Sequence, residues 1–331
     1  DLDWEYPVEG GLEGNNHHPD DGIHLTLLLQ RIRQMLNEQE AITGRTYYLT
    51  IASSGNPVMM DHLELEAISE VLDWINIMSY DFHGPWSGEG DPVTNFNSPL
   101  YSVEEDPTPE PYHSEFNLSS SVQNYIDRGV PKDKLNAGLA FYGRAFGGVS
   151  SGENGLFASY SGPAGDGTWE NGVFDYWDLK DNYIDSYGYN SYWQSEALVP
   201  WIYNPIDQVM ISYDNEQSIY EKALYIVNED LGGAMFWEFS GDKNVDLLNQ
   251  VVEKTGPLKK CATPAAKYRL KACFQRKQEG SKGFDCSREL IETIKPKERD
   301  NCGIKLGKIR ILLKQFENLT TGYEACLKLK P

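Results

Sequence analysis

Asp1-Leu2-Asp3-Trp4-Glu5-Tyr6-Pro7 opens the chain, and the interpretation of the whole fold depends on this stretch. Its acidic residues, Asp1, Asp3 and Glu5, occupy alternate positions, so on a β-strand all three side chains project to one face. Leu2 and Trp4 project to the other face, where the helices of an α/β fold would cover them. Three carboxylates on one face repel one another, and we expect this repulsion to raise the pKa of at least one into the range of a proton donor.

A protonated carboxyl beside an anionic one is the arrangement that cleavage of a glycosidic bond requires. The acid protonates the leaving oxygen, and the anion stabilises the positive charge that develops on the sugar. At the carboxyl end of a strand in an α/β barrel, such groups are usually catalytic. Two other interpretations stay open from these residues alone, a solvated acidic loop and a calcium site of the Asp-x-Asp-x-Glu type. The calcium site is disfavoured because Trp4, Tyr6 and Pro7 stand where a calcium loop usually turns at glycine.

Strand and helix patterns alternate up to about residue 256, as in a parallel α/β fold. We expect parallel strands at about residues 1, 47, 74, 135 and 233, and helices at about 25–40, 63–71, 119–128, 216–229 and 242–254. A closed barrel needs eight strands. The sequence therefore predicts a (β/α)8 TIM barrel truncated at the N-terminus, with three strands before Asp1. We expect the chain expressed alone to aggregate or to be inactive, because strand edges and apolar faces would be exposed.

Residues 147–211 interrupt this alternation. They are rich in Gly, Tyr and Trp, with β-like stretches at Thr168–Asp175 and Val199–Tyr203. We predict a small α+β insertion domain here, which divides the barrel into residues 1–146 and 212–256. Its tryptophans are expected mostly to fill a small core, although stacking on sugars is an alternative; they are Trp169, Trp177, Trp193 and Trp201.

Residues 257–331 differ sharply in charge from the rest of the chain. They hold 18 of the 29 Lys and Arg and 8 of the 50 Asp and Glu, a local balance of +10, whereas residues 1–256 carry −31. The acidic part argues against a nucleic-acid partner, because phosphates would be repelled. No run of about 18 apolar residues predicts a membrane span.

For residues 257–331 we predict a C-terminal extension of several short helices whose role is unknown. A small helical cap that packs on the acidic part of the chain is the slightly favoured interpretation. The extension contains every cysteine of the chain, at spacings unlike those of a zinc site: Cys261, Cys273, Cys286, Cys302 and Cys326. We interpret them as disulfide formers in a secreted, extracellular protein.

The first residues resemble the end of the DxxDxDxE signature of family 18 glycoside hydrolases. The first Asp of that signature would lie three residues before Asp1. Further stretches resemble the family's motifs in the family's order: Ile77-Met78-Ser79-Tyr80-Asp81, Gly84-Pro85-Trp86, Phe141-Tyr142-Gly143-Arg144 and Gly233-Ala234-Met235-Phe236-Trp237-Glu238. Gly167-Thr168-Trp169-Glu170 is similar to the family's insertion. The resemblance covers about residues 1–250 and is to bacterial-type chitinases.

The resemblance implies a mechanism without a protein nucleophile, in which the substrate's own N-acetyl carbonyl attacks the anomeric carbon. Glu5 is then the general acid and later the base, and Asp3 orients the acetamide and stabilises an oxazolinium-like intermediate. Asp1 is expected to be a buried partner of Asp3. Tyr80 would donate its hydroxyl to the acetamide oxygen. No cofactor and no metal are implied.

Seven residues are implied to bind substrate. Trp237 would form the floor under the cleaved sugar, and Trp86 a platform on the leaving side. The whole set is Tyr6, Met78, Asp81, Trp86, Tyr142, Arg144 and Trp237. Without the resemblance, Trp237 and Met78 would be interpreted as core residues and Arg144 as half of a surface ion pair. The histidines His17, His18 and His83 are interpreted as polar loop residues, because no metal-ligand spacing connects them.

The function expected from this resemblance is that of a chitinase, which hydrolyses β-1,4 bonds between N-acetylglucosamine units with retention of configuration. Its partner is then chitin or a chitooligosaccharide. Two alternatives stay open: an endo-β-N-acetylglucosaminidase acting on N-glycans, and a non-catalytic chitin-binding lectin. The lectin is disfavoured because Glu5 and its acidic neighbours are intact. The choice between endo and exo action, and the oligomeric state, are left open.

Overall fold

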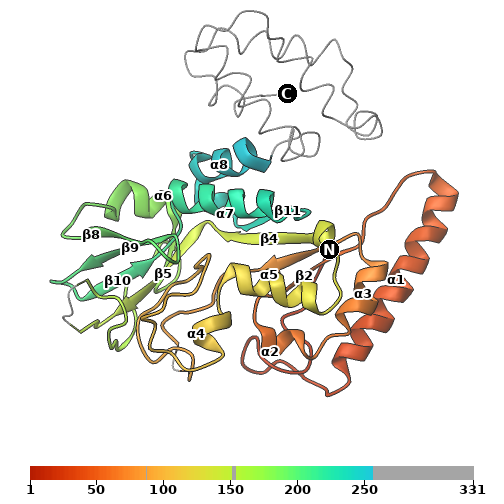
Figure 1. Cartoon of the computed structure of the whole chain (residues 1–331), viewed down its shortest axis with the longest axis horizontal. Helices are drawn as coiled ribbons and strands as arrows, with labels where there is room; N and C mark the ends of the chain where they lie inside the picture. Colours follow the sequence, from red (N-terminus) through yellow and green to blue (C-terminus); the bar gives the residue numbers. More distant parts are fainter. Residues whose placement is uncertain (87, 151–153, 256–331) are drawn as a thin grey trace, which may run out of the picture. The chain divides into compact units, whose positions relative to one another are not determined.

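Five parallel strands form the sheet that begins with the acidic N-terminal stretch (Figure 1). In the computed structural model its order is β1-β2-β3-β4-β11. The strands are β1 (Leu2–Asp3), β2 (Thr50–Ser54), β3 (Trp74–Met78), β4 (Leu135–Ala140) and β11 (Gly233–Trp237). Parallel strands were predicted at these five places, and the pairing confirms them.

The structure describes residues 1–86, 88–150 and 154–255. Within these residues the sheet order does not return from β11 to β1, so the sheet is open, and the closed barrel stays a prediction. The predicted extension 257–331 and its cysteines, with the disulfides expected of them, lie outside the described residues. No helix within the described ranges has the length and apolar character that a bilayer crossing demands.

Helices connect the parallel strands and cover one face of the sheet. Along β2, β3 and β4 the alternation of side chains buries one row against this helical layer, for example Ile51, Ile75 and Leu139. The helices are α1 (Asp21–Thr43), α2 (Pro57–Met60), α3 (Leu65–Val71), α4 (Tyr112–Glu115), α5 (Leu118–Asp127), α6 (Tyr176–Asp178), α7 (Glu216–Asn228) and α8 (Asp246–Thr255). Shorter helical turns occur at Lys132–Lys134, Leu179–Tyr183 and Phe239–Asp242.

The other row of the same strands faces a cleft. The register places Ala52 beside Asn76 and Asn76 beside Asn136, while Asp3 lies beside Ala52. Side chains of one row therefore come from neighbouring strands and meet at one level. Because the strands are parallel, their carboxyl ends lie at the same edge, where the acidic stretch, the end of β3 and the end of β11 converge.

A second, antiparallel sheet follows β4 in the chain, and Figure 1 shows its strands grouped together in green. Its order is β6-β5-β10-β9-β8, with β7 also paired to β5. The strands are β5 (Tyr142–Gly147), β6 (Gly162–Pro163), β7 (Val173–Asp175), β8 (Asn190–Gln194), β9 (Val199–Asn204) and β10 (Val209–Ser212). Its core gathers Phe146, Val199, Trp201 and Met210.

The second sheet includes β5, although all of this strand except its last residue, Gly147, falls in the predicted unit 1–146. The strand expected at about residue 135 ends at Ala140, and the chain passes almost at once into β5, which pairs with β10. Local sequence does not mark this break, since apolar residues continue on both sides of it. The change of sheet depends on pairing with residues more than sixty positions later.

Candidate active site

The three carboxylates at the start of the chain line one cleft of about 350 Å³. Asp3 is placed by the pairing of β1 with β2, and Glu5 follows directly where the strand ends. The predicted alternation therefore brings Asp1, Asp3 and Glu5 to a common face. Most of the other residues singled out from the sequence line the same cleft: Tyr6, Met78, Tyr80, Asp81, Tyr142, Arg144 and Trp237.

Glu5 has a pKa above its ordinary value of 4.5. The largest cause is the loss of water around the carboxyl, followed by the negative charge of Asp3 and a hydrogen bond with Asp3. The charge of Asp81 acts in the same direction, whereas a hydrogen bond with Tyr6 opposes it. Repulsion between the carboxylates, the cause expected from the sequence, contributes less than burial by the cleft walls. Glu5 as a whole residue is nevertheless exposed, so its carboxyl can reach a ligand.

Asp1 is exposed in this structure, contrary to the expectation of a buried partner for Asp3. One of its carboxylate oxygens accepts a hydrogen bond of 2.5 Å from the Thr50 hydroxyl and a longer one of 3.4 Å from the Asn76 amide. Asn76 in turn accepts a hydrogen bond of 3.0 Å from the amide of Asn136. Asp1 is thus anchored along the cleft row of β2, β3 and β4.

Tyr80 follows β3 and stays a neutral hydrogen-bond donor. Burial first, and then the charges of Asp81 and Glu5, raise the pKa of its hydroxyl above the ordinary value. Its hydroxyl lies 3.7 Å from the sulfur of Met235, and its ring meets that of Tyr142 edge to face at 6.1 Å. A thioether is a weak acceptor, so the hydroxyl has capacity to bind a ligand oxygen.

Asp81 is held by two residues of β5. The Arg144 guanidinium donates two hydrogen bonds to the carboxylate, of 2.8 and 2.7 Å, and the Tyr142 hydroxyl donates a third of 2.7 Å. Burial lowers the pKa of Arg144, but its bonds to Asp81 outweigh this and raise the pKa overall. The alternative of an ion pair for Arg144 is therefore realised within the cleft, where it joins the end of β3 to the second sheet.

Of the predicted aromatic and apolar contacts, Tyr6, Met78 and Trp237 line the cleft and Trp86 does not. Met78 and Tyr6 lie in the cleft, and burial raises the pKa of the Tyr6 hydroxyl, with the charge of Glu5 as the next cause. Trp237 lines the cleft with 52% of its surface exposed, so it is not a core residue. Trp86 is not among the residues that line it; its ring lies 5.3 Å from the Arg144 guanidinium carbon instead.

Several residues that line the cleft were not predicted from the sequence. Asn76 and Met235 belong to β3 and β11, and each lies two positions before a residue that was predicted, Met78 and Trp237. Strand alternation is the signal that would have found them. Three further lining residues that were not predicted come from the second sheet and its loops: Glu170, Val173 and Asp175.

Trp169 is the tryptophan of the predicted insertion that lines the cleft, and it is 63% exposed. Its indole N–H donates a hydrogen bond of 3.1 Å to Asp175, and Trp177 donates one of 2.9 Å to the other oxygen of the same carboxylate. Trp201, in contrast, is buried against Phe96. The expectation of a core role thus holds for Trp201, while Trp169 is presented to the cleft.

A cluster of polar side chains lies apart from the cleft residues at the start of α1. A ring nitrogen of His18, a carboxylate oxygen of Asp21 and a ring nitrogen of His24, all atoms of the kind that bind metal ions, lie within 4.8 Å of one another. Asp21 accepts the backbone N–H of His18 at 2.8 Å, which is the main cause of a lowered pKa for this carboxyl, and that of Val8 at 3.4 Å. These bonds fix the loop that leads into the helix.

Comparison with known proteins agrees with this geometry. The sequence profile of the glycosyl hydrolases family 18 matches residues 1–242, and the chain belongs to that family. Chitinase A1 of Niallia circulans is 44% identical over 252 residues, which cover 76% of this chain and 36% of the relative. The chain thus spans about a third of the length of this relative.

Two solved structures show the same relation. Chitinase ChiA74 from Bacillus thuringiensis superposes with a TM-score of 0.71 at 38% identity, over 76% of this chain and 42% of that one. A family 18 N-acetylglucosaminidase from Paenibacillus barengoltzii gives a TM-score of 0.68 at 33% identity, over 76% of this chain and 69% of its own. The mixed α/β architecture is that of family 18 catalytic domains.

Proposed function

We propose that the protein is a chitinase, which hydrolyses β-1,4 bonds between N-acetylglucosamine units. The observation that carries this proposal is the position of Glu5: a carboxyl with a raised pKa that lines the same cleft as the Tyr80 hydroxyl and the exposed Trp237 indole. Membership in family 18 and the likeness to proteins named chitinases support the substrate class. Chitin or a chitooligosaccharide is the partner that follows from it.

The proposed reaction begins with a proton transfer from Glu5 to the glycosidic oxygen. The bond between that oxygen and the anomeric carbon breaks, and its electron pair stays on the leaving sugar. The carbonyl oxygen of the substrate's acetamide forms a bond to the anomeric carbon from the opposite face, which gives an oxazolinium ion. Glu5, now a carboxylate, takes a proton from water as the water attacks the anomeric carbon. The bond between that carbon and the acetamide oxygen breaks, its electron pair returns to the oxygen, and the neutral acetamide is restored. Two displacements retain the configuration.

Asp3 and Tyr80 are proposed to hold the acetamide during this sequence. Asp3, next to Glu5, would accept the acetamide N–H and stabilise the positive charge of the oxazolinium ion. The neutral hydroxyl of Tyr80 would donate to the acetamide oxygen and keep it close to the anomeric carbon. Asp1 would act through Asp3. Trp237 offers a flat indole that matches the apolar face of a pyranose ring.

The remaining predicted contacts are proposed as parts of the sugar groove. Tyr142, Arg144 and Asp81 form one wall through their mutual hydrogen bonds, and the rim of this wall would contact neighbouring sugars. Met78 would pack under the acetamide methyl group, and Tyr6 would lie beside Glu5. Trp86, behind the Arg144 guanidinium, is proposed to bind sugar on the leaving side, outside the cleft proper.

Finer features of the architecture are part of the same proposal. The parallel sheet would belong to a (β/α)8 barrel formed by residues 1–146 and 212–256, and residues 147–211 to an insertion domain that raises one wall of the groove. The position of Trp169, Glu170 and Asp175 along the cleft supports this role. A secreted, extracellular location is proposed because chitin is a polymer too large to enter a cell.

Replacement of Glu5 by Gln in the complete natural protein tests the proposed function. The release of reducing ends from colloidal chitin should fall by about 10²- to 10⁴-fold, because the amide cannot donate the proton. Binding of a chitooligosaccharide, followed by calorimetry, should persist. A wild-type protein that releases sugar from an N-glycoprotein but not from colloidal chitin would identify an endo-β-N-acetylglucosaminidase. Binding by a wild-type protein without turnover would identify a lectin.

A further inference from the structure

The segment that carries Tyr80 and Asp81 has a backbone that needs support from outside. Asp81 has a φ of 55°, in the left-handed region that residues other than glycine rarely occupy. Its N–H donates to the side-chain oxygen of Asn97 at 3.1 Å, and the N–H of Phe82 donates to the Asn97 carbonyl at 3.0 Å. These two bonds hold the backbone on the far side of Tyr80 from β3.

A third bond holds the near side. The Ser98 hydroxyl donates to the carbonyl of Ser79 at 2.8 Å, and the Ser79 hydroxyl is bonded to both backbone groups of Gly138 on β4. The carbonyl of Ser79 belongs to the peptide group that leads into Tyr80. Asn97 and Ser98, which are neighbours in the chain, thus bind the backbone of residues 79–82 on both sides of Tyr80.

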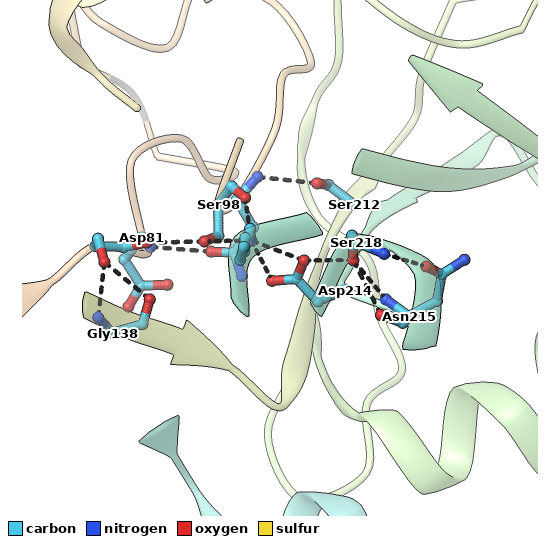
Figure 2. A network of polar contacts seen from close by, with 10 residues as sticks. Asp81, Ser98, Gly138, Ser212, Asp214, Asn215 and Ser218 are labelled. Atoms are coloured by element: carbon cyan, nitrogen blue, oxygen red, sulfur yellow. Dashed lines mark hydrogen bonds and ion pairs between the residues drawn. The ribbon is translucent and has the colours of Figure 1, made fainter. Parts of the chain in front are cut away.

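Groups from two other elements fix the positions of Asn97 and Ser98. The backbone N–H of Asn97 donates to the Ser212 hydroxyl on β10 at 2.9 Å. Figure 2 shows Ser98, Ser212 and Asp214 in the same network of polar contacts as Asp81. The Lys222 ammonium on α7 donates to the Ser98 hydroxyl at 2.9 Å and also to the Ser98 carbonyl. One serine hydroxyl therefore lies between a lysine and the peptide group before Tyr80.

Lys222 is paired with Asp214, and the pair is out of contact with water. The side chain of Lys222 is 0% exposed and that of Asp214 is 1% exposed. The ammonium lies 2.7 and 2.6 Å from the two carboxylate oxygens, and the Ser218 hydroxyl donates to one of them at 2.6 Å. Burial lowers the pKa of Lys222, and the charge of Asp214 opposes this shift.

Stability alone explains this pair poorly. Removing two charges from water is expensive, and replacing a buried ion pair by apolar side chains of similar volume is often neutral or stabilising. An ion pair differs from an apolar contact in fixing donors and acceptors in defined directions. The Asn97 side-chain nitrogen is buried without a hydrogen-bond partner among the described residues, which lowers the stability of the fold. The fold accepts this loss at the residue whose side-chain oxygen binds the N–H of Asp81.

We infer that Lys222 and Asp214 are positioning residues for the reaction. Through Ser98 and Asn97 they set the place of the Tyr80 hydroxyl and the Asp81 carboxylate, although neither of them lines the cleft. The inference rests on the proposed function for its kinetic consequence. Its structural consequence, the order of the segment 79–82, does not depend on which reaction the cleft performs.

Two substitutions in the complete natural protein separate positioning from stability. Lys222→Met leaves Asp214 buried without its partner, and the Tm should fall steeply because an unpaired buried charge is strongly destabilising. The double variant Lys222→Met with Asp214→Asn carries no buried charge, and most of the lost Tm should return. The kcat on a soluble chitooligosaccharide should stay reduced by about 10-fold or more in the double variant, with a much smaller change in KM.

Tyr125→Phe is the matched control. The Tyr125 hydroxyl is also buried, and it donates to Ser53 at 2.6 Å and to the Ser54 carbonyl at 2.8 Å, on the opposite side of β3. Its removal should lower the Tm without changing kcat. Amide hydrogen exchange supplies a readout apart from turnover. The amides of Asp81 and Phe82 should exchange faster in the double variant and at the wild-type rate in the control.

Return of kcat together with Tm in the double variant, with unchanged exchange at Asp81 and Phe82, would overturn the inference, because the pair would then serve folding alone. That result is distinct from a failure of the proposed function. The function fails if Glu5→Gln leaves hydrolysis intact, and the exchange comparison still decides whether Lys222 and Asp214 order the segment. Faster exchange at these two amides alone supports the inference in either case.

Discussion

At Glu5 the largest influence on the carboxyl is the exclusion of water by the cleft walls, and the neighbouring charges add to it. Both act against the carboxylate, so the folded protein favours the protonated form more than an unfolded chain does. A group of this kind suits the first step of glycoside cleavage, in which the acid must hold its proton until the leaving oxygen needs it.

The raised pKa of Glu5 predicts a change in stability with pH. The favourable contribution of the neutral carboxyl is fully present below 4.5, its ordinary pKa, and is lost as the pH rises through the higher folded-state value. Glu5→Gln keeps the side chain neutral at every pH. The variant should therefore have a higher Tm than the wild type at neutral pH and a similar Tm in acid. Thermal unfolding at both pH values measures this, and an equal difference at the two would contradict it.

Tyr80→Phe should reduce kcat by about 10- to 100-fold with a smaller effect on KM, because the lost hydroxyl orients the acetamide without carrying much binding energy. Steady-state kinetics on a soluble oligosaccharide tests this. Tyr187→Phe, at a side chain that is 77% exposed, is the control and should leave both constants unchanged. A rise in KM with unaltered kcat would assign Tyr80 to binding instead of orientation.

At the scale of elements, the parts predictable from the sequence are those encoded locally. Alternation along Asp1–Glu5 and the apolar stretches at β2, β3, β4 and β11 mark strands and the face each residue takes, so most cleft residues were found. The break between β4 and β5 was not, because β5 is stabilised by pairing with β10, more than sixty positions later in the chain.

The same reason explains what was missed beneath the cleft. Lys222 and Ser98 are 124 positions apart, and nothing in either local sequence announces that they meet. Asp214 lies in the short connection before α7, eight positions before Lys222, so helical spacing does not connect them. A buried polar contact becomes visible only when the fold has brought its members together.

Gly138 on β4 predicts a further property of the parallel sheet. A Cβ at this position would lie 2.2 Å from the backbone oxygen of Ile77 and 3.0 Å from the Tyr80 ring, and backbone cannot give way as a flexible side chain can. Gly138→Ala should therefore destabilise the fold by about 1–3 kcal/mol or more. Chemical denaturation measures this. Gly165→Ala, where a Cβ has open space, is the control and should cost far less.

At the scale of the whole molecule, charge dominates the expected response to solvent. Residues 1–256 hold 42 acidic and 11 basic side chains, and residues 1–331 together have a net charge of −21. Repulsion among so many carboxylates destabilises a compact state. Local ion pairs such as Lys180 with Glu216 and Asp246 oppose this, but basic residues are too few to balance the acidic excess.

Added salt is therefore expected to raise the Tm. Between low ionic strength and about 0.5 M sodium chloride, the screening length falls well below the spacing of surface charges. The gain should be smallest near pH 4.6, the isoelectric point expected from the sequence, because the net charge is close to zero there. Thermal unfolding over a salt series at neutral pH and at this pH checks both parts. A Tm that falls with salt at neutral pH would mean that the ion pairs outweigh the general repulsion.

The bonds from Arg144 and Tyr142 to Asp81 have a consequence for recognition. They tie a strand end of the parallel sheet to a strand of the antiparallel one at the rim of the groove. A rim joined by these hydrogen bonds is preorganised before a sugar binds, so the protein loses little conformational entropy on binding. The groove then has a fixed shape, and selectivity depends on which sugar fits that shape without a rearrangement of the protein.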